Sequence, residues 1–251
     1  MSKPSRNSRR HILQAGLAMG GLSLFGARGL AQKQQTGSPV ASSLKRCTPK
    51  GDLLTALLTG NRHFAIAWQE IRSISDPSER ALRLRNHLNS NCQVDPQALE
   101  QGQQPWAAVL TCSDSRIPLE WIFGVGDGEI FGVRSAGNTA FTEGIASLEY
   151  AVAELQVPII LVMGHRGCGA VKAALSRKKI SSPLLRSLVE QISSNTKATN
   201  NLEDAVKANI QATVEQIKSR STLLSEAIQS KSVSLASAYF DIDLGTVELL
   251  R

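Results

Sequence analysis

The feature that most restricts the fold of this chain is an uninterrupted apolar run, VPIILVMGH, at residues 157–165. A short run without polar alternation is typical of a strand that is covered on both faces, as in a parallel sheet. A helical pattern, GAVKAALSRK at residues 169–178, follows it at once. A buried strand that leads directly into a helix is the repeating unit of α/β proteins, so this stretch favours that class.

The same alternation recurs along most of the chain. Further strands are predicted at residues 105–113, 128–138 and 232–250, the last of them interrupted by a turn at 241–245. Further helices are predicted at residues 52–70 with a break at Gly60, at 77–91, at 143–156, and at 202–229 as one long or two short helices. We therefore expect a mainly parallel sheet flanked by helices, with an N-terminal helical arm.

Chemically reactive side chains follow two of the predicted strands. Cys112 ends the first, in VLTCSDSRIP, and His165 and Cys168 follow another, in MGHRGCGA. Ligands of open parallel sheets bind beyond the carboxyl ends of the strands, so the three side chains are expected at one edge. Thiolates and imidazole favour zinc, and three protein ligands leave a fourth position open, as in catalytic zinc sites.

Each of these residues taken alone has a simpler explanation. A cysteine at a strand end is most often a core residue, and a histidine at a helix start is often only a hydrogen-bonding group. Cys112 as a nucleophile also stays open, because that role requires only a nearby base and an oxyanion site. The three residues taken together favour the interpretation that they bind a metal ion.

The stretches CSDSR and GHRGCG resemble, in this order, the two signature motifs of the β-class carbonic anhydrases. The resemblance spans roughly residues 51–251 and includes LLTGNRHF, GEIFGVRSAGN and AYFDIDLGTVELL. It implies a β-carbonic-anhydrase-like domain at 51–251. It also implies a lyase activity, the zinc-dependent reversible hydration of carbon dioxide to bicarbonate and a proton, in which zinc-bound hydroxide attacks CO2.

The resemblance also assigns roles to individual residues. It implies that one Zn²⁺ per chain is held by Cys112, His165 and Cys168, and that Asp114 and Arg116 form a catalytic dyad. It further implies a substrate pocket: Gln103 donates to the substrate, often across a dimer interface, and Phe131 and Tyr150 line an apolar CO2 pocket.

Two properties of the site follow from these roles. Asp114 either orients the zinc-bound hydroxide or, if Arg116 releases it, replaces the hydroxide on zinc, and we expect the first arrangement. Two thiolates cancel the charge of the ion, so it should acidify water less than zinc held by three neutral histidines does. Hydration activity is therefore expected to rise into the alkaline range.

Members of this family are dimers or multiples of dimers, so a homo-oligomer is expected. The helix at 52–70 then wraps a partner subunit, or alternatively packs on its own sheet.

Two other functions remain open: hydrolysis of CS2 or COS on the same fold, and zinc binding without turnover, as in a sensor. An assay of CO2 hydration separates them.

The N-terminus reads as an export signal. SRRHIL at residues 8–13 resembles a twin-arginine motif and is followed by an apolar, glycine-rich run too short for a good membrane span. We expect a signal peptide at 1–31, a linker at 32–50 and a bacterial periplasmic location. The alternative is an uncleaved anchor or arm, which would supply the only expected membrane contact.

The basic charge of the chain comes mostly from this leader. Five of the 28 basic residues lie in residues 1–31, which leaves 23 against 21 acidic residues and a net charge of +2 instead of +7. That balance gives no reason to expect nucleic-acid binding.

The remaining cysteines, Cys47 and Cys92, either form a disulfide in an oxidising compartment or stay unpaired.

Overall fold

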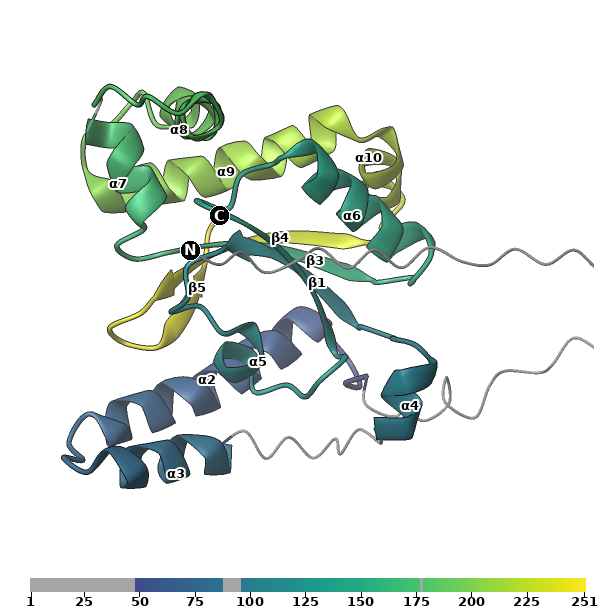
Figure 1. The fold of residues 1–251 in the computed structure, drawn as a ribbon. Helices are drawn as coiled ribbons and strands as arrows, with labels where there is room; N and C mark the ends of the chain where they lie inside the picture. The colour runs from purple at the N-terminus through teal and green to yellow at the C-terminus, as the bar shows by residue number, and fades with distance from the viewer. Residues whose placement is uncertain (1–47, 88–95, 177) are drawn as a thin grey trace, which may run out of the picture. The chain divides into compact units, whose positions relative to one another are not determined.

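The computed structural model describes residues 48–87, 96–176 and 178–251. The predicted signal peptide, most of the predicted linker, and both Cys47 and Cys92 lie outside these residues. The described residues form one sheet with helices on both faces (Figure 1). Among them, no helix combines the length and the apolar character needed to cross a bilayer.

The sheet has five strands in the order β2-β1-β3-β4-β5. The strands are β1 (Ala107–Cys112), β2 (Ile130–Ser135), β3 (Ile159–His165), β4 (Ser234–Asp241) and β5 (Thr246–Leu249). The first four are parallel, and only β5 runs antiparallel, against β4. The prediction of a mainly parallel sheet is confirmed. The parallel register brings the ends of β1 and β3 to the same edge.

Two groups of helices cover the two faces (Figure 1). One face carries α6 (Thr142–Ala153), α7 (Gly169–Ser176), α8 (Pro183–Asn195), α9 (Leu202–Arg220) and α10 (Thr222–Gln229). The other carries α2 (Leu53–Ile71), α3 (Pro77–His87) and α5 (Leu119–Phe123), and α4 (Pro96–Gln101) precedes β1. Successive side chains of a strand point to opposite faces, so Leu110 joins the first core and Val109 the second. Every residue of β1 and β3 is buried, which explains their continuous apolar runs.

The break predicted at Gly60 is wrong, because α2 continues through it. A Cβ atom at Gly60 would lie 1.7 Å from the carbonyl oxygen of Phe123, in α5. The glycine therefore permits close contact between two helices and does not interrupt one.

The structure decides between the two alternatives for residues 202–229. They form two helices, because Ser221 is extended and its Oγ accepts the Leu224 N–H as the cap of α10. The helix α8 has no counterpart among the predicted elements, although Ser182 at its cap and Pro183 in its first turn are helix-start signals.

Candidate metal centre

Three donor atoms from two strand ends converge on one point. Cys112 is the last residue of β1, His165 is the last residue of β3, and Cys168 lies in the turn between β3 and α7. Their ligand atoms all lie within 4.8 Å of one another, and the three residues are 4%, 0% and 1% exposed. The structure therefore brings together the three predicted ligands.

The imidazole of His165 is oriented for metal binding. Its Nδ1 lies 3.0 Å from the carbonyl oxygen of Arg166, and a carbonyl oxygen only accepts, so Nδ1 carries the proton. Its Nε2 is buried and has no hydrogen-bond partner among the described residues. A free lone pair that points at two sulfur atoms is the arrangement a metal ion requires.

The two thiols lie close together, with their sulfur atoms 3.9 Å apart. Hydrogen bonding to Cys168 and to the backbone N–H groups of Gly137 and Asp114 lowers the pKa of Cys112 despite burial. The same contact, with burial, raises the pKa of Cys168. Two thiolates this close repel each other, so loss of both protons requires a positive charge beside them, which a metal ion supplies.

The predicted dyad stands beside these donors. Arg116 binds Asp114 with two parallel hydrogen bonds, Nε to Oδ1 at 2.9 Å and Nη2 to Oδ2 at 2.7 Å. The guanidinium of Arg116 holds the pKa of the Asp114 carboxyl well below its usual range, so Asp114 is a carboxylate. Its Oδ2 lies 3.7 Å from Nε2 of His165, close to where the donors meet.

Arg134 supports this loop and was not among the predicted site residues. Its guanidinium donates to the carbonyl oxygen of Cys112 at 2.9 and 3.1 Å and to that of Asp114 at 2.8 Å. It therefore fixes the backbone on both sides of the loop that carries a ligand and the dyad carboxylate. The signal in the sequence was an arginine near the end of an otherwise apolar strand.

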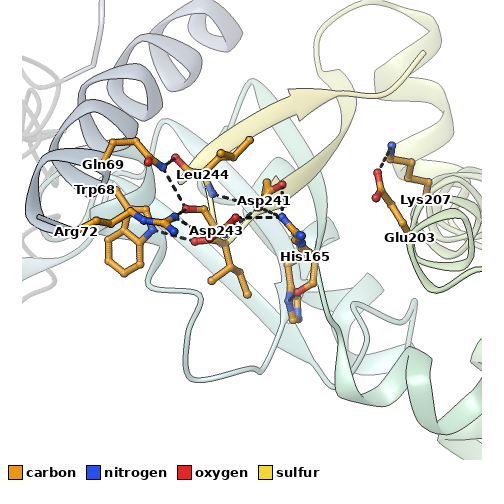
Figure 2. Close-up of polar contacts among 11 residues, drawn as sticks. Trp68, Gln69, Arg72, His165, Glu203, Lys207, Asp241, Asp243 and Leu244 are labelled. Atoms are coloured by element: carbon orange, nitrogen blue, oxygen red, sulfur yellow. Dashed lines mark hydrogen bonds and ion pairs between the residues drawn. The ribbon is translucent and has the colours of Figure 1, made fainter.

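Arg166, the residue after the histidine, forms ion pairs with the turn between β4 and β5. Arg166 pairs with Asp241 at 3.2 Å and with Asp243 at 3.5 Å, and Asp243 pairs at 2.7 Å with Arg72, the residue that caps the C-terminus of α2. Three side chains at this end of α2 donate to carbonyl groups of the turn (Figure 2): Trp68, Gln69 and Arg72. The backbone that orients His165 is thus anchored to α2 through a chain of charged groups.

Comparison with known proteins identifies the family. A family model described as carbonic anhydrase matches residues 107–247, more than half of the chain. The chain belongs to the carbonic anhydrase family. It is 30% identical over 197 residues to carbonic anhydrase 2 of Mycobacterium tuberculosis, covering 75% of this chain and 94% of that protein. It is 36% identical over 160 residues to a carbonic anhydrase of Mycolicibacterium smegmatis, covering 61% and 78%.

Solved structures place it in the β class. A tetrameric β-carbonic anhydrase of Sordaria macrospora superimposes with a TM-score of 0.54 at 28% identity, covering 61% of this chain and 84% of that one. A β-carbonic anhydrase of Coccomyxa shares the fold, with a TM-score of 0.57 at 22% identity, covering 70% and 86%. The predicted fold class is confirmed.

The β-carbonic anhydrases use zinc, and the donor set here fits that ion. Two buried sulfur atoms and a free imidazole nitrogen within 4.8 Å form a Cys₂His set, which suits tetrahedral zinc with one open position. Cys112, His165 and Cys168 are the residues that would hold it.

The three residues predicted to contact substrate lie elsewhere in this carbonic anhydrase. Phe131 pairs with Ala108 near the start of β1, so it lies about 13 Å along the sheet from the level of Cys112, at 3.3 Å per residue. Its ring centroid is 6.2 Å from that of Tyr150, which is 48% exposed. Gln103 is exposed, just before β1. Within one chain these residues lie toward the amino ends of the strands and do not join the metal ligands.

Proposed function

We propose that this chain is a zinc enzyme that catalyses the reversible hydration of CO2 to bicarbonate and a proton. The observation that carries the proposal is the free Nε2 of His165, which faces two buried sulfur atoms beside an ionised Asp114. Bound there, zinc would act as a Lewis acid that activates water toward CO2. Family membership supports the same activity.

The protein side chains position the water and its proton. Both oxygens of Asp114 accept hydrogen bonds from Arg116, which leaves the carboxylate ionised and fixed in direction. A carboxylate fixed in this way accepts a hydrogen bond from the reacting water. The water is then oriented with a lone pair toward the carbon atom of CO2. Arg116 binds both oxygens of Asp114. We therefore propose the arrangement in which Asp114 orients the nucleophile and does not occupy the fourth ligand position.

The test pairs metal analysis with a stopped-flow assay on the purified protein. We expect about one zinc per chain and CO2 hydration that disappears with the metal and returns when zinc is restored. COS and CS2 are assayed in parallel. Zinc-loaded protein that turns over only these substrates, or none, would contradict the proposal.

We also propose that the working unit is a homodimer or a multiple of dimers, in which the substrate pocket forms between chains. Gln103, Phe131 and Tyr150 lie away from the metal ligands of their own chain, so they reach substrate only at the site of another copy. The half-exposed ring of Tyr150 is available for such a contact. A relative from Sordaria macrospora is tetrameric.

Finally, we propose export by the twin-arginine pathway to the periplasm, with removal of residues 1–31. The support is the sequence SRRHIL with its apolar, small-residue continuation. This route carries folded proteins, which suits a thiolate metal site that forms only on folding. Changing Arg9 and Arg10 together to lysine should leave full-length protein in the cytoplasm on fractionation, and periplasmic protein from that variant would contradict the proposal.

A further inference from the structure

The turn after β2 lies against one of the metal ligands. The backbone N–H of Gly137 donates to Sγ of Cys112 over 3.2 Å. Gly137 has φ +74°, and a Cβ there would lie 2.6 Å from Cδ1 of Ile192. This left-handed φ favours glycine, so a side chain at position 137 would strain the turn that carries the N–H.

Two side chains of α9 bind the same turn from behind. Asn209 Nδ2 donates to the carbonyl oxygen of Gly137 at 2.7 Å, and Thr213 Oγ1 donates to that of Asn138 at 3.1 Å. All of these groups are buried, and Asn209 and Thr213 are 0% exposed. Asn209 is itself held, since its Oδ1 accepts from Asn195 Nδ2 at 2.9 Å.

We propose that Asn209 and Thr213 are positioning residues that set the electron donation of Cys112 to the metal. They hold the turn so that the Gly137 N–H stays on the sulfur. A hydrogen bond to a thiolate withdraws electron density from it and weakens its donation to the ion. The helix α9 thus controls a ligand that it does not touch. The inference rests on the metal site proposed above.

A purely structural role is the alternative, because buried carbonyl groups require hydrogen-bond partners in any case. The two roles differ in what they change. Loss of a structural bond lowers stability alone. Loss of the N–H bond to sulfur also raises the energy of the sulfur electrons, which shifts the sulfur-to-metal charge-transfer absorption to lower energy.

The experiment replaces zinc by cobalt(II) and records this absorption in Asn209→Leu, Thr213→Val and wild-type protein. Asn195→Ala is the matched control, because it unpairs Asn209 Oδ1 in the same buried network but leaves the bond to Gly137. We expect the band to move to lower energy in the first two variants and to stay in the control.

An unchanged band in a folded, cobalt-loaded Asn209→Leu protein would overturn the inference, and so would an equal shift in the control. If Asn209→Leu does not fold, Thr213→Val decides by the same criterion, since it keeps the shape of the side chain. The spectrum does not depend on turnover. Zinc-loaded wild-type protein that does not hydrate CO2 would therefore contradict the proposed function and leave this inference standing.

Discussion

At the scale of single residues, the predicted dyad and the predicted metal ligands are expected to have different roles, one in turnover and the other in metal binding. Asp114 is held through both of its oxygens by Arg116 and lies beside the ligands without belonging to the set of three. We therefore propose that it acts on the reacting water and not as a metal ligand. Changes at Asp114 and at the ligands should have different consequences.

Asp114→Asn should keep about one zinc per chain and lose CO2 hydration by about 10- to 100-fold, because a group beside the ligands orients the reacting water. Asparagine keeps the shape but loses the charge that Arg116 binds. Stopped-flow hydration and metal analysis on the same sample measure both quantities. Full activity in the variant would remove Asp114 from the mechanism.

Cys168→Ser should lose zinc, because a serine hydroxyl stays protonated near neutral pH and is a poor zinc ligand. Cys47→Ser and Cys92→Ser are the matched controls, since neither residue is a predicted ligand, and both should retain the metal. Metal analysis after gel filtration measures the outcome. Stoichiometric zinc in Cys168→Ser would mean that the ligand assignment is wrong.

The rate of CO2 hydration should rise with pH from mildly acidic into alkaline conditions, because two thiolates reduce the charge that the ion presents to water. Asp114 should add no inflection in this range. The hydrogen bond from Arg116 lowers the pKa of Asp114, so this carboxylate stays charged at every pH above the ordinary pKa of an aspartate. It becomes protonated only in strong acid. A pH–rate profile that is flat down to mildly acidic pH would contradict the expectation.

At the scale of elements, the site depends on turns that are held by neighbouring helices and strands. The loop after β1 is fixed by Arg134 of β2, and the turn after β2 by α9. Arg166, the residue after His165, forms ion pairs with the turn between β4 and β5, and side chains at the C-terminal end of α2 hold that turn. The position of α2 therefore matters to the site as well as to the core.

Gly60→Ala should destabilise the protein by about 3 kcal/mol, since the added methyl group would overlap the Phe123 carbonyl and force α2 away from α5. Gly169→Ala is a matched helical control with no atom within 4 Å of the new methyl group, and it should be neutral or stabilising by up to about 1 kcal/mol. Urea unfolding of the metal-free proteins measures both. Equal stability of the two variants would show that the α2–α5 contact is not tight.

At the scale of the whole molecule, the proposed dimer predicts complementation between two inactive variants. Cys168→Ser lacks a metal site but keeps Gln103, and Gln103→Ala keeps the metal site but lacks the glutamine. In a mixed dimer one site would receive both intact parts, because each chain supplies what the other lacks. Co-expression with two affinity tags should therefore give mixed dimers that hydrate CO2 faster than either parent. If Gln103 serves its own chain, mixing restores nothing.

The sequence by itself determined the mainly parallel sheet and predicted the three side chains that the structure brings together as a candidate metal site. Both are local signals: continuous apolar strands report burial on both faces, and cysteine and histidine at strand ends report the edge where ligands bind. Each of the two motifs spans only a few residues, and the dyad was predicted from the resemblance of CSDSR to a family motif.

Only the tertiary structure decided which distant residues support that site. The sequence suggested a helix break at Gly60. The group that requires a glycine there, the Phe123 carbonyl, lies 63 positions away in the chain. No role was predicted for Arg134 or Asn209, and their roles appear only when β2 and α9 are packed against the ligand loops. The separation of Phe131 from Cys112 follows from strand register, which pairing between chain segments sets. Contacts between distant segments have no local signal, so they can be read only from the folded chain.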